Sequence, residues 1–230
     1  IAGGMLGIAV PEFRLPRKVI EEEIAHIQSC GVEILYNSPI DARHTVNDLM
    51  AEGYSSVFIA AGAQSSRQMG IPGEDEGLEG LYYGLQFLAD IRTVKEIKVK
   101  GRVVVIGGGN VAFDTARTVL RMGAEDVQIF YRRTIEEMPA WEKDIREAVE
   151  EGVVVNPLWA PKQILQQDGR ITGIEFVRSK TVNDETGRSY LSVDEESTQL
   201  VEADAVIISV GQAPDISFLS EDSKLERALW

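Results

Sequence analysis

The 230-residue sequence predicts an α/β fold. Helical patterns alternate with short apolar runs, which is typical of helices packed on a parallel sheet. One apolar run, residues 103–106, leads through a glycine-rich turn into an amphipathic helix. A later stretch alternates apolar and polar residues around two turns, which indicates a small antiparallel meander. We therefore expect a parallel α/β domain with an antiparallel addition.

The first hundred residues contain two helix–strand units and a surface connection. After a Gly-rich loop, helices are expected over residues 16–29 and 45–52, with strands over 32–36 and 56–61. Residues 63–101 are rich in Gly, Ser and acidic residues, as a connection would be, and hold one helix near 83–94. The domain boundary is expected near residue 101.

The remainder of the chain continues the alternation. We expect strands over 103–106, 127–131 and 153–155, helices over 110–122 and 140–151, and a last buried strand within 203–211. The meander lies between, with turns at Asp168–Gly169 and Thr186–Gly187. The chain thus divides into a domain over 102–211, a connection over 71–101, and two outer parts, 1–70 and 212–230.

Charge and cysteine content exclude several classes of function. The net charge is −14, from 23 basic and 37 acidic residues, which disfavours nucleic acid and anionic membranes as partners. No apolar run reaches about 18 residues, so no membrane span is expected. Cys30 is the only cysteine, so the chain forms neither an internal disulfide nor an iron–sulfur cluster. We expect a cytoplasmic protein without a metal site.

The turn after residue 106 has the pattern Gly107-x-Gly109-x-x-Ala112, a dinucleotide fingerprint with alanine in the third place. Gly107 permits the tight turn, Gly109 allows a pyrophosphate to approach the backbone, and Ala112 keeps the helix close to the sheet. Gly108, Asn110 and Val111 complete the loop, and the helix start supplies free N–H groups. The alternative is a tight turn in a sheet that binds nothing.

Two arginines, Arg132 and Arg133, follow the next strand. An NAD site places a carboxylate at this strand end for the ribose 2′-hydroxyl, and none is present there. The planar, permanently charged guanidinium suits a 2′-phosphate instead. The pair therefore predicts NADP(H); a solvated basic pair on an exposed loop is the alternative.

Several stretches together resemble a known family. GGMLGIAVPEFRLPRKVIEEEI, FIAAGAQ, IPGEDEG, VVVIGGGNVAFDTARTVLRMGA, YRRTIEEMPA and ADAVIISVGQAPD match, in order, the small (beta) subunit of NADPH-dependent glutamate synthase and its relatives, including the corresponding domains of dihydropyrimidine dehydrogenase. The resemblance implies a flavoprotein fold with two dinucleotide-binding domains. A Rossmann-like NADPH domain, 102–211, is joined to part of an FAD domain over 1–70 and from 212 onward.

The resemblance also implies roles for individual residues. The loop Gly107–Ala112 corresponds to the pyrophosphate site, and Arg132 and Arg133 to the 2′-phosphate clamp. Gly211 corresponds to a glycine on the nicotinamide side. The residues that correspond to the approach to FAD are Gly4, Leu6, Arg14 and Gly62. The family's FAD fingerprint precedes GGML and a further FAD segment follows GQAPD, so the chain looks like an internal part of such a protein.

The implied function is to pass electrons from NADPH to FAD, and on to an iron–sulfur domain or a partner like the glutamate synthase large subunit. Hydride transfer between these cofactors needs no protein acid or base, so no catalytic side chain is expected. Asp114 and Asp144 are expected on solvated helix faces. The alternatives are a non-enzymatic nucleotide-binding regulatory or scaffolding domain and a short-chain-type dehydrogenase. The latter is disfavoured because no Tyr-x-x-x-Lys pair occurs.

Overall fold

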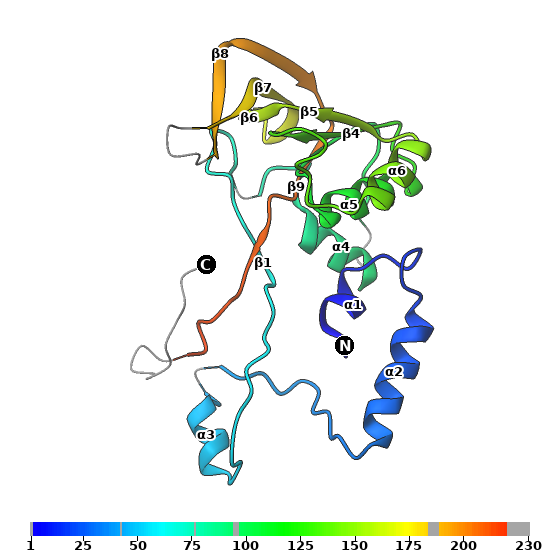
Figure 1. The fold of residues 1–230 in the computed structure, drawn as a ribbon, viewed down its shortest axis with the longest axis vertical. Coiled ribbons are helices and arrows are strands. Elements are labelled where there is room, and N and C mark those ends of the chain that lie inside the picture. Colours follow the sequence, from blue (N-terminus) through cyan, green and yellow to red (C-terminus); the bar gives the residue numbers. More distant parts are fainter. Residues whose placement is uncertain (1, 42, 76, 94–96, 184–188, 220–230) are drawn as a thin grey trace.

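The computed structural model describes residues 2–41, 43–75, 77–93, 97–183 and 189–219. Figure 1 shows an upper body that holds the two larger sheets and the helices between residues 84 and 150, and a lower part formed by the earlier helices and by extended segments. Two antiparallel segments, β1 (Ser65–Ser66) and β10 (Gln212–Ala213), pair with each other where the chain passes between the two parts. The upper body carries most of the buried core.

A five-stranded parallel sheet organises the upper body. Its strand order is β2-β9-β3-β4-β5. The strands are β2 (Leu81–Tyr83), β3 (Arg102–Ile106), β4 (Asp126–Tyr131), β5 (Val154–Pro157) and β9 (Ala205–Ile208). The strands expected from apolar runs after residue 101 are therefore confirmed. The edge strand β2 was not expected, because it lies in the segment read as a surface connection.

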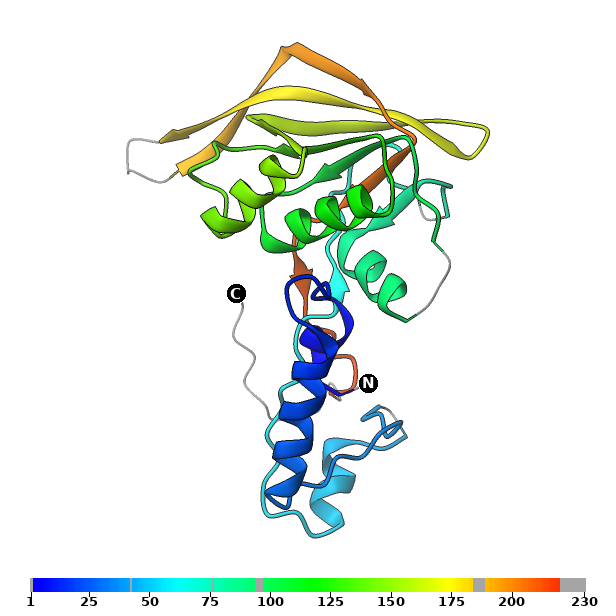
Figure 2. The same cartoon turned by 90° about the vertical axis from the view of Figure 1, so that its right-hand side faces the viewer.

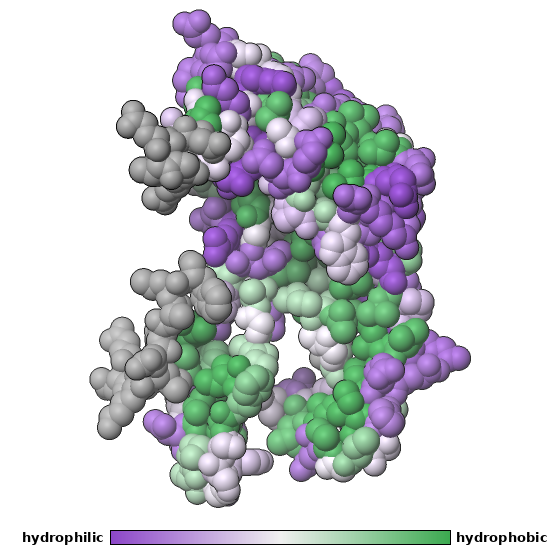
Figure 3. Space-filling model, in the orientation of Figure 1, coloured by the Kyte–Doolittle hydropathy of each residue, from purple (hydrophilic) through white to green (hydrophobic). Residues whose placement is uncertain are grey.

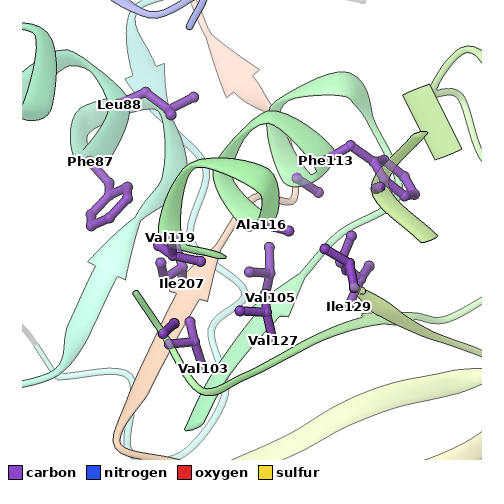
Figure 4. Close-up of a cluster of buried hydrophobic side chains, with 14 of the residues drawn as sticks. Phe87, Leu88, Val103, Val105, Phe113, Ala116, Val119, Val127, Ile129 and Ile207 are labelled. Atoms are coloured by element: carbon purple, nitrogen blue, oxygen red, sulfur yellow. The ribbon is translucent and has the colours of Figure 1, made fainter. Parts of the chain in front are cut away.

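Both faces of this sheet are covered, which is why β3 reads as an unbroken apolar run. Val103 and Val105 face the helices α4 (Gly84–Arg92), α5 (Asn110–Arg121) and α6 (Glu142–Glu150), in the core drawn in Figure 4. Val104 and Ile106 belong to a second core on the opposite face. Figure 2 shows the helices below the parallel sheet and the antiparallel strands above it.

The expected meander forms the second layer. It consists of β6 (Trp159–Gln167), β7 (Arg170–Asn183) and β8 (Ser189–Glu202), paired antiparallel in that order. Asp168 and Gly169 have φ of 52° and 78°, as a tight hairpin turn requires. The turn expected at Thr186–Gly187 lies outside the described residues. Phe176 of β7 stacks on Phe130 of β4 at 4.1 Å between ring centroids, which fixes the meander on the sheet.

The lower part differs from expectation. It contains α1 (Gly4–Ile8), α2 (Arg17–Ser29) and α3 (Val46–Ala51), so the Gly-rich start is partly helical. The strands expected over 32–36 and 56–61 are not formed. A strand requires a neighbour for its backbone hydrogen bonds, and the described chain offers these segments none. Phe58 is 92% exposed, and Figure 3 shows apolar surface in the lower half around α3.

Candidate functional site

The candidate site lies at the carboxyl edge of the parallel sheet. The register pairs Ile106 with both Phe130 and Ile208, so the chain leaves β3, β4 and β9 at nearly the same level. The loop Gly107–Ala112, the pair Arg132–Arg133 and Gly211 follow these three strand ends. Ligands of open α/β sheets bind at this edge, where loops from neighbouring strands meet.

The three glycines of the loop differ in their surroundings. Gly107 has φ +146°, and a Cβ there would lie 2.3 Å from the Ser209 carbonyl oxygen. A Cβ on Gly108 would lie 2.6 Å from the Tyr131 ring. A Cβ on Gly109 would meet only Pro139, at 3.9 Å. Packing therefore requires glycine at 107 and 108, whereas the space beside Gly109 is open for a ligand.

The helix after the loop provides an anion-binding end. α5 starts at Asn110, and the N–H groups of its first turn have no acceptor within the helix, apart from short bonds such as Ala112 N–H to Gly109 O at 2.9 Å. The segment before α6 holds the loop in place. The backbone N–H of Trp141 donates to Asn110 Oδ1 at 3.1 Å, and that of Ala140 donates to Gly108 O at 3.1 Å.

The guanidinium groups of the two arginines have no acidic partner at ion-pair distance in the described part of the chain. Arg132 is exposed, Arg133 is partly buried, and the Nε–H of Arg133 is buried without a hydrogen-bond partner. Among the described residues, no carboxylate forms an ion pair with either guanidinium. Both side chains are thus available to an anion at the strand end, next to the glycine loop.

The nearby acid Glu137 is held by neutral groups. Its carboxylate accepts hydrogen bonds from Thr134 N–H at 3.1 Å and from the Thr181 hydroxyl at 3.0 Å. The Thr134 N–H bond, opposed by burial and helped by the Thr181 hydroxyl, lowers the pKa of Glu137 below its ordinary value. The Tyr131 hydroxyl donates to the backbone carbonyl of Glu137, and burial raises the pKa of Tyr131. The Arg133 charge also lowers the pKa of Glu137, but the described residues show no ion pair between this carboxylate and either arginine.

The residues expected near FAD are spread over the lower part. Gly4 and Leu6 lie on α1, and Leu6 is 53% exposed. Gly62, with φ +73°, lies in the segment that leads into β1. A groove of about 790 Å³ lies beside this segment. It is largely apolar and is lined by residues 57–61, Gln64 and Asp215, among others.

Arg14, the fourth residue of that set, contacts the upper body. Its guanidinium donates to both carboxylate oxygens of Asp114, at 2.9 and 2.8 Å, and forms an ion pair with Asp144 at 2.9 Å. The expectation that these acids lie on solvated faces is wrong, since Asp114 and Asp144 are 5% and 4% exposed. Burial raises the pKa of Asp114, and the bonds from Arg14 oppose that shift.

Gly211 lies between the two parts. It has φ +124°, and its carbonyl oxygen accepts a hydrogen bond from Arg67 N–H at 3.0 Å. These residues flank the β1–β10 pair, so Gly211 lies where the chain leaves the sheet for the lower part.

Sequence reasoning missed the side chains that hold the site from the meander. Ser179 of β7 donates from its hydroxyl to Arg132 O at 2.7 Å, and Thr181 bonds Glu137. No local pattern marks these two residues, because they lie on an ordinary alternating strand far along the chain. Their role appears only once β7 packs beside the end of β4.

Metal clusters and membrane-spanning helices are both absent from the described residues of the chain. Those residues contain no group of three or more His, Cys, Asp or Glu side chains able to hold a metal ion. None of the helices they form has the length and apolarity needed to cross a bilayer.

Curated relatives match almost the whole chain. The beta subunit of an NADP(+)-dependent formate dehydrogenase from Moorella thermoacetica is 40% identical over 98% of the chain and 32% of its own length. The beta subunit of an NADPH-Fe(3+) oxidoreductase from Geobacter sulfurreducens is 37% identical over 99% of the chain and 34% of its own length. The small chain of NADPH glutamate synthase from Escherichia coli is 32% identical over 92% of the chain and 47% of its own length.

The chain thus spans from about a third to about half of the length of these relatives. All three carry the name of a subunit or small chain. The resemblance drawn from the sequence, to the glutamate synthase small subunit and its relatives, is confirmed.

Solved structures agree with the expected flavoprotein fold. FprA from Mycobacterium tuberculosis in complex with NADPH superposes with a TM-score of 0.74 at 20% identity, over 91% of this chain and 61% of FprA. Thioredoxin reductase from T. acidophilum superposes with a TM-score of 0.55 at 19% identity, over 98% of this chain and 71% of the reductase.

A family model covers most of the chain, residues 17–228, and its description is pyridine nucleotide-disulphide oxidoreductase. The expected cofactors, NADP(H) and FAD, agree with this assignment at the level of the family. The chain belongs to the pyridine nucleotide-disulphide oxidoreductase family.

Proposed function

We propose that this chain is the NADPH-binding portion of a flavin and iron–sulfur oxidoreductase. In this proposal electrons pass from NADPH to FAD and on to a partner, as in glutamate synthase. The observation that carries it is that an open glycine loop and two arginines lie at the same sheet edge, and neither arginine forms an ion pair with a described carboxylate. The relatives' names, with NADP or NADPH in each, support the choice of nucleotide.

Each part of the site has a distinct binding role. The open space at Gly109 and the N-terminal end of α5 receive the pyrophosphate, since the backbone N–H groups and the helix dipole favour negative charge there. Arg132 and Arg133 receive the ribose 2′-phosphate, for which a planar fork of donors is well suited. Gly211 lies toward the nicotinamide end.

The protein's contribution to the reaction is to bind and to orient. When bound, the nicotinamide supplies a hydride and the flavin accepts it, so no side chain need exchange a proton. On the flavin side, we assign FAD to the apolar groove beside residues 57–61 and to the residues that the resemblance places near it, which are Gly4, Leu6, Arg14 and Gly62. The paired segments β1 and β10 connect the proposed nucleotide side to the proposed flavin side. In this proposal they help to set how the two cofactors are oriented toward each other.

The proposed partner is an iron–sulfur domain or a large subunit like that of glutamate synthase. The subunit names of the relatives support a multi-subunit assembly. We also propose a cytoplasmic location, since a single exposed thiol, Cys30, suits a reducing compartment.

The test is nucleotide binding by the Gly109→Val variant. Valine has room in the protein, because only Pro139 lies within 4 Å of the added Cβ, but its side chain enters the space assigned to the pyrophosphate. We expect NADP+ binding, measured by titration calorimetry, to weaken at least about tenfold, equivalent to about 1.4 kcal/mol. The melting temperature should change little. A folded variant that binds NADP+ like the wild type would show that the loop is not the site.

A further inference from the structure

The antiparallel meander contacts the backbone of the arginine pair. The Ser179 hydroxyl on β7 donates to Arg132 O at 2.7 Å. The backbone N–H of Leu158, between β5 and β6, donates to Arg133 O at 3.0 Å. The two carbonyls that follow β4 are therefore held by β7 of the meander and by the connection that leads into the meander.

Ser179 and Leu158 are also joined to each other. The backbone N–H of Ser179 donates to Leu158 O at 2.9 Å. Leu158 has φ +65°, a left-handed conformation that is rare outside glycine. This conformation gives Leu158 hydrogen bonds to both Arg133 and Ser179. Together with Arg132 and Arg133, these two residues form a closed set of hydrogen bonds around the base of the two arginine side chains.

A second contact holds the other end of the segment. The Thr181 hydroxyl, two residues along β7 and on the same face, bonds the Glu137 carboxylate at 3.0 Å. That carboxylate accepts from Thr134 N–H at 3.1 Å. Residues 132–137 are thus fixed at both ends by one face of β7.

Because Ser179 is buried, its bond to Arg132 O should matter more for the arginine backbone than the bond of Thr181 to Glu137. Ser179 is 3% exposed, so water does not replace its hydroxyl if it is removed. Truncation would leave Arg132 O without this donor. A part-buried carbonyl that loses its partner either shifts to find another or costs free energy. The Arg132 side chain itself is exposed, so its direction depends chiefly on the backbone beneath it.

We propose that Ser179 is a positioning residue that sets the preference for a nucleotide carrying a ribose 2′-phosphate. The inference rests on the proposed function, and it assigns a purpose to the meander beyond covering the sheet. Ser179 does not touch the phosphate; it fixes the backbone from which Arg132 and Arg133 extend. Selectivity for the phosphate therefore depends on a buried hydroxyl in a different layer of the fold.

The test compares binding of NADP+ and NAD+ to Ser179→Ala by titration calorimetry. Removing one hydrogen bond that orients the arginines should weaken NADP+ about threefold to tenfold and leave NAD+ unchanged. The matched control is Thr198→Ala, which removes an exposed hydroxyl from β8 and should change neither affinity. Equal losses for both nucleotides, or no loss in a folded variant, would overturn the proposal.

One further variant, together with the nucleotide preference of the wild type, keeps the outcomes distinct. Should Ser179→Ala not fold, Ser179→Cys keeps nearly the same shape with a weaker donor, and the same criterion applies to it. If the wild type binds NADP+ and NAD+ equally, the proposed nucleotide assignment is what fails, and the role of Ser179 fails with it. If the wild type prefers NADP+ and the Ser179 variant keeps the full preference, only the role of Ser179 is wrong.

Discussion

At the scale of single residues, the glycine loop combines two different requirements. Gly107 and Gly108 are fixed by the protein's own packing, since a Cβ would overlap Ser209 or Tyr131. Gly109 lacks such a constraint and faces open space. A sequence pattern treats the three glycines alike. Only the surrounding atoms distinguish the two that the packing requires from the one that faces open space.

The residue-level failure of sequence reasoning concerned Asp114 and Asp144. Both lie on helices and appear without a partner when the sequence is read locally. Their partner, Arg14, stands 100 residues before Asp114, in a different part of the fold. No periodicity or spacing encodes such a contact, because it depends on how the two parts pack.

At the scale of elements, an ion-pair cluster joins α5 to the end of α6. Glu151 accepts hydrogen bonds from Arg117 and from Arg121, and these bonds lower its pKa to about 2 from an ordinary 4.5. A carboxylate with a lowered pKa stabilises the fold fully above about pH 4.5. This contribution is lost as the pH falls toward 2.

Glu151→Gln should therefore flatten the acid limb of the stability curve. Urea unfolding between pH 4.5 and 2 should show a smaller loss of stability with falling pH in this variant than in the wild type. The neighbouring Glu150→Gln is the control, because Glu150 is 68% exposed and its pair with Arg146 is long, at 3.8 Å. If both variants lose stability as steeply as the wild type, the assignment to Glu151 is wrong.

The elements also show where prediction from sequence succeeds. Apolar runs and turn residues correctly predicted β3, β4, α5, α6 and the meander. In each of these elements the apolar pattern and the turn residues lie within a short stretch of sequence. The expected strands at 32–36 and 56–61 have similar composition but no partner strand in the described chain. β2 was missed for the opposite reason: three residues in a loop-like segment become a strand because β9 is beside them.

At the scale of the whole molecule, Arg14 ties the lower part to the upper body. It lies between α1 and α2 and reaches α5 and α6 through Asp114 and Asp144. Phe13 beside it packs under the guanidinium groups of Arg117 and Arg121, at 4.7 and 4.1 Å from its ring centroid. The lower part is thereby anchored to the two helices that flank the candidate nucleotide site.

Arg14→Ala should destabilise the protein by about 3–5 kcal/mol, since it leaves two buried carboxylates without their cation. Thermal unfolding would report a lower melting temperature, and limited proteolysis would cut the first residues faster. Arg17→Ala is the control, because its pair with Glu21 is exposed and 4.0 Å long. Equal melting temperatures for the two variants would show that the Arg14 contacts do not anchor the lower part.

The central claim, that this molecule binds NADP(H) through the arginine pair, is tested most directly by Arg132→Ala. Charged hydrogen bonds contribute roughly 1.5–3 kcal/mol each, so the variant should bind NADP+ about tenfold to a hundredfold more weakly while NAD+ binding stays the same. The difference should shrink with rising salt, because Arg132 is exposed. The control is Arg170→Ala, which removes an exposed arginine at the start of β7. It should change the binding of neither NADP+ nor NAD+. A wild type without preference for NADP+, or equal losses of both nucleotides in Arg132→Ala, would contradict the account.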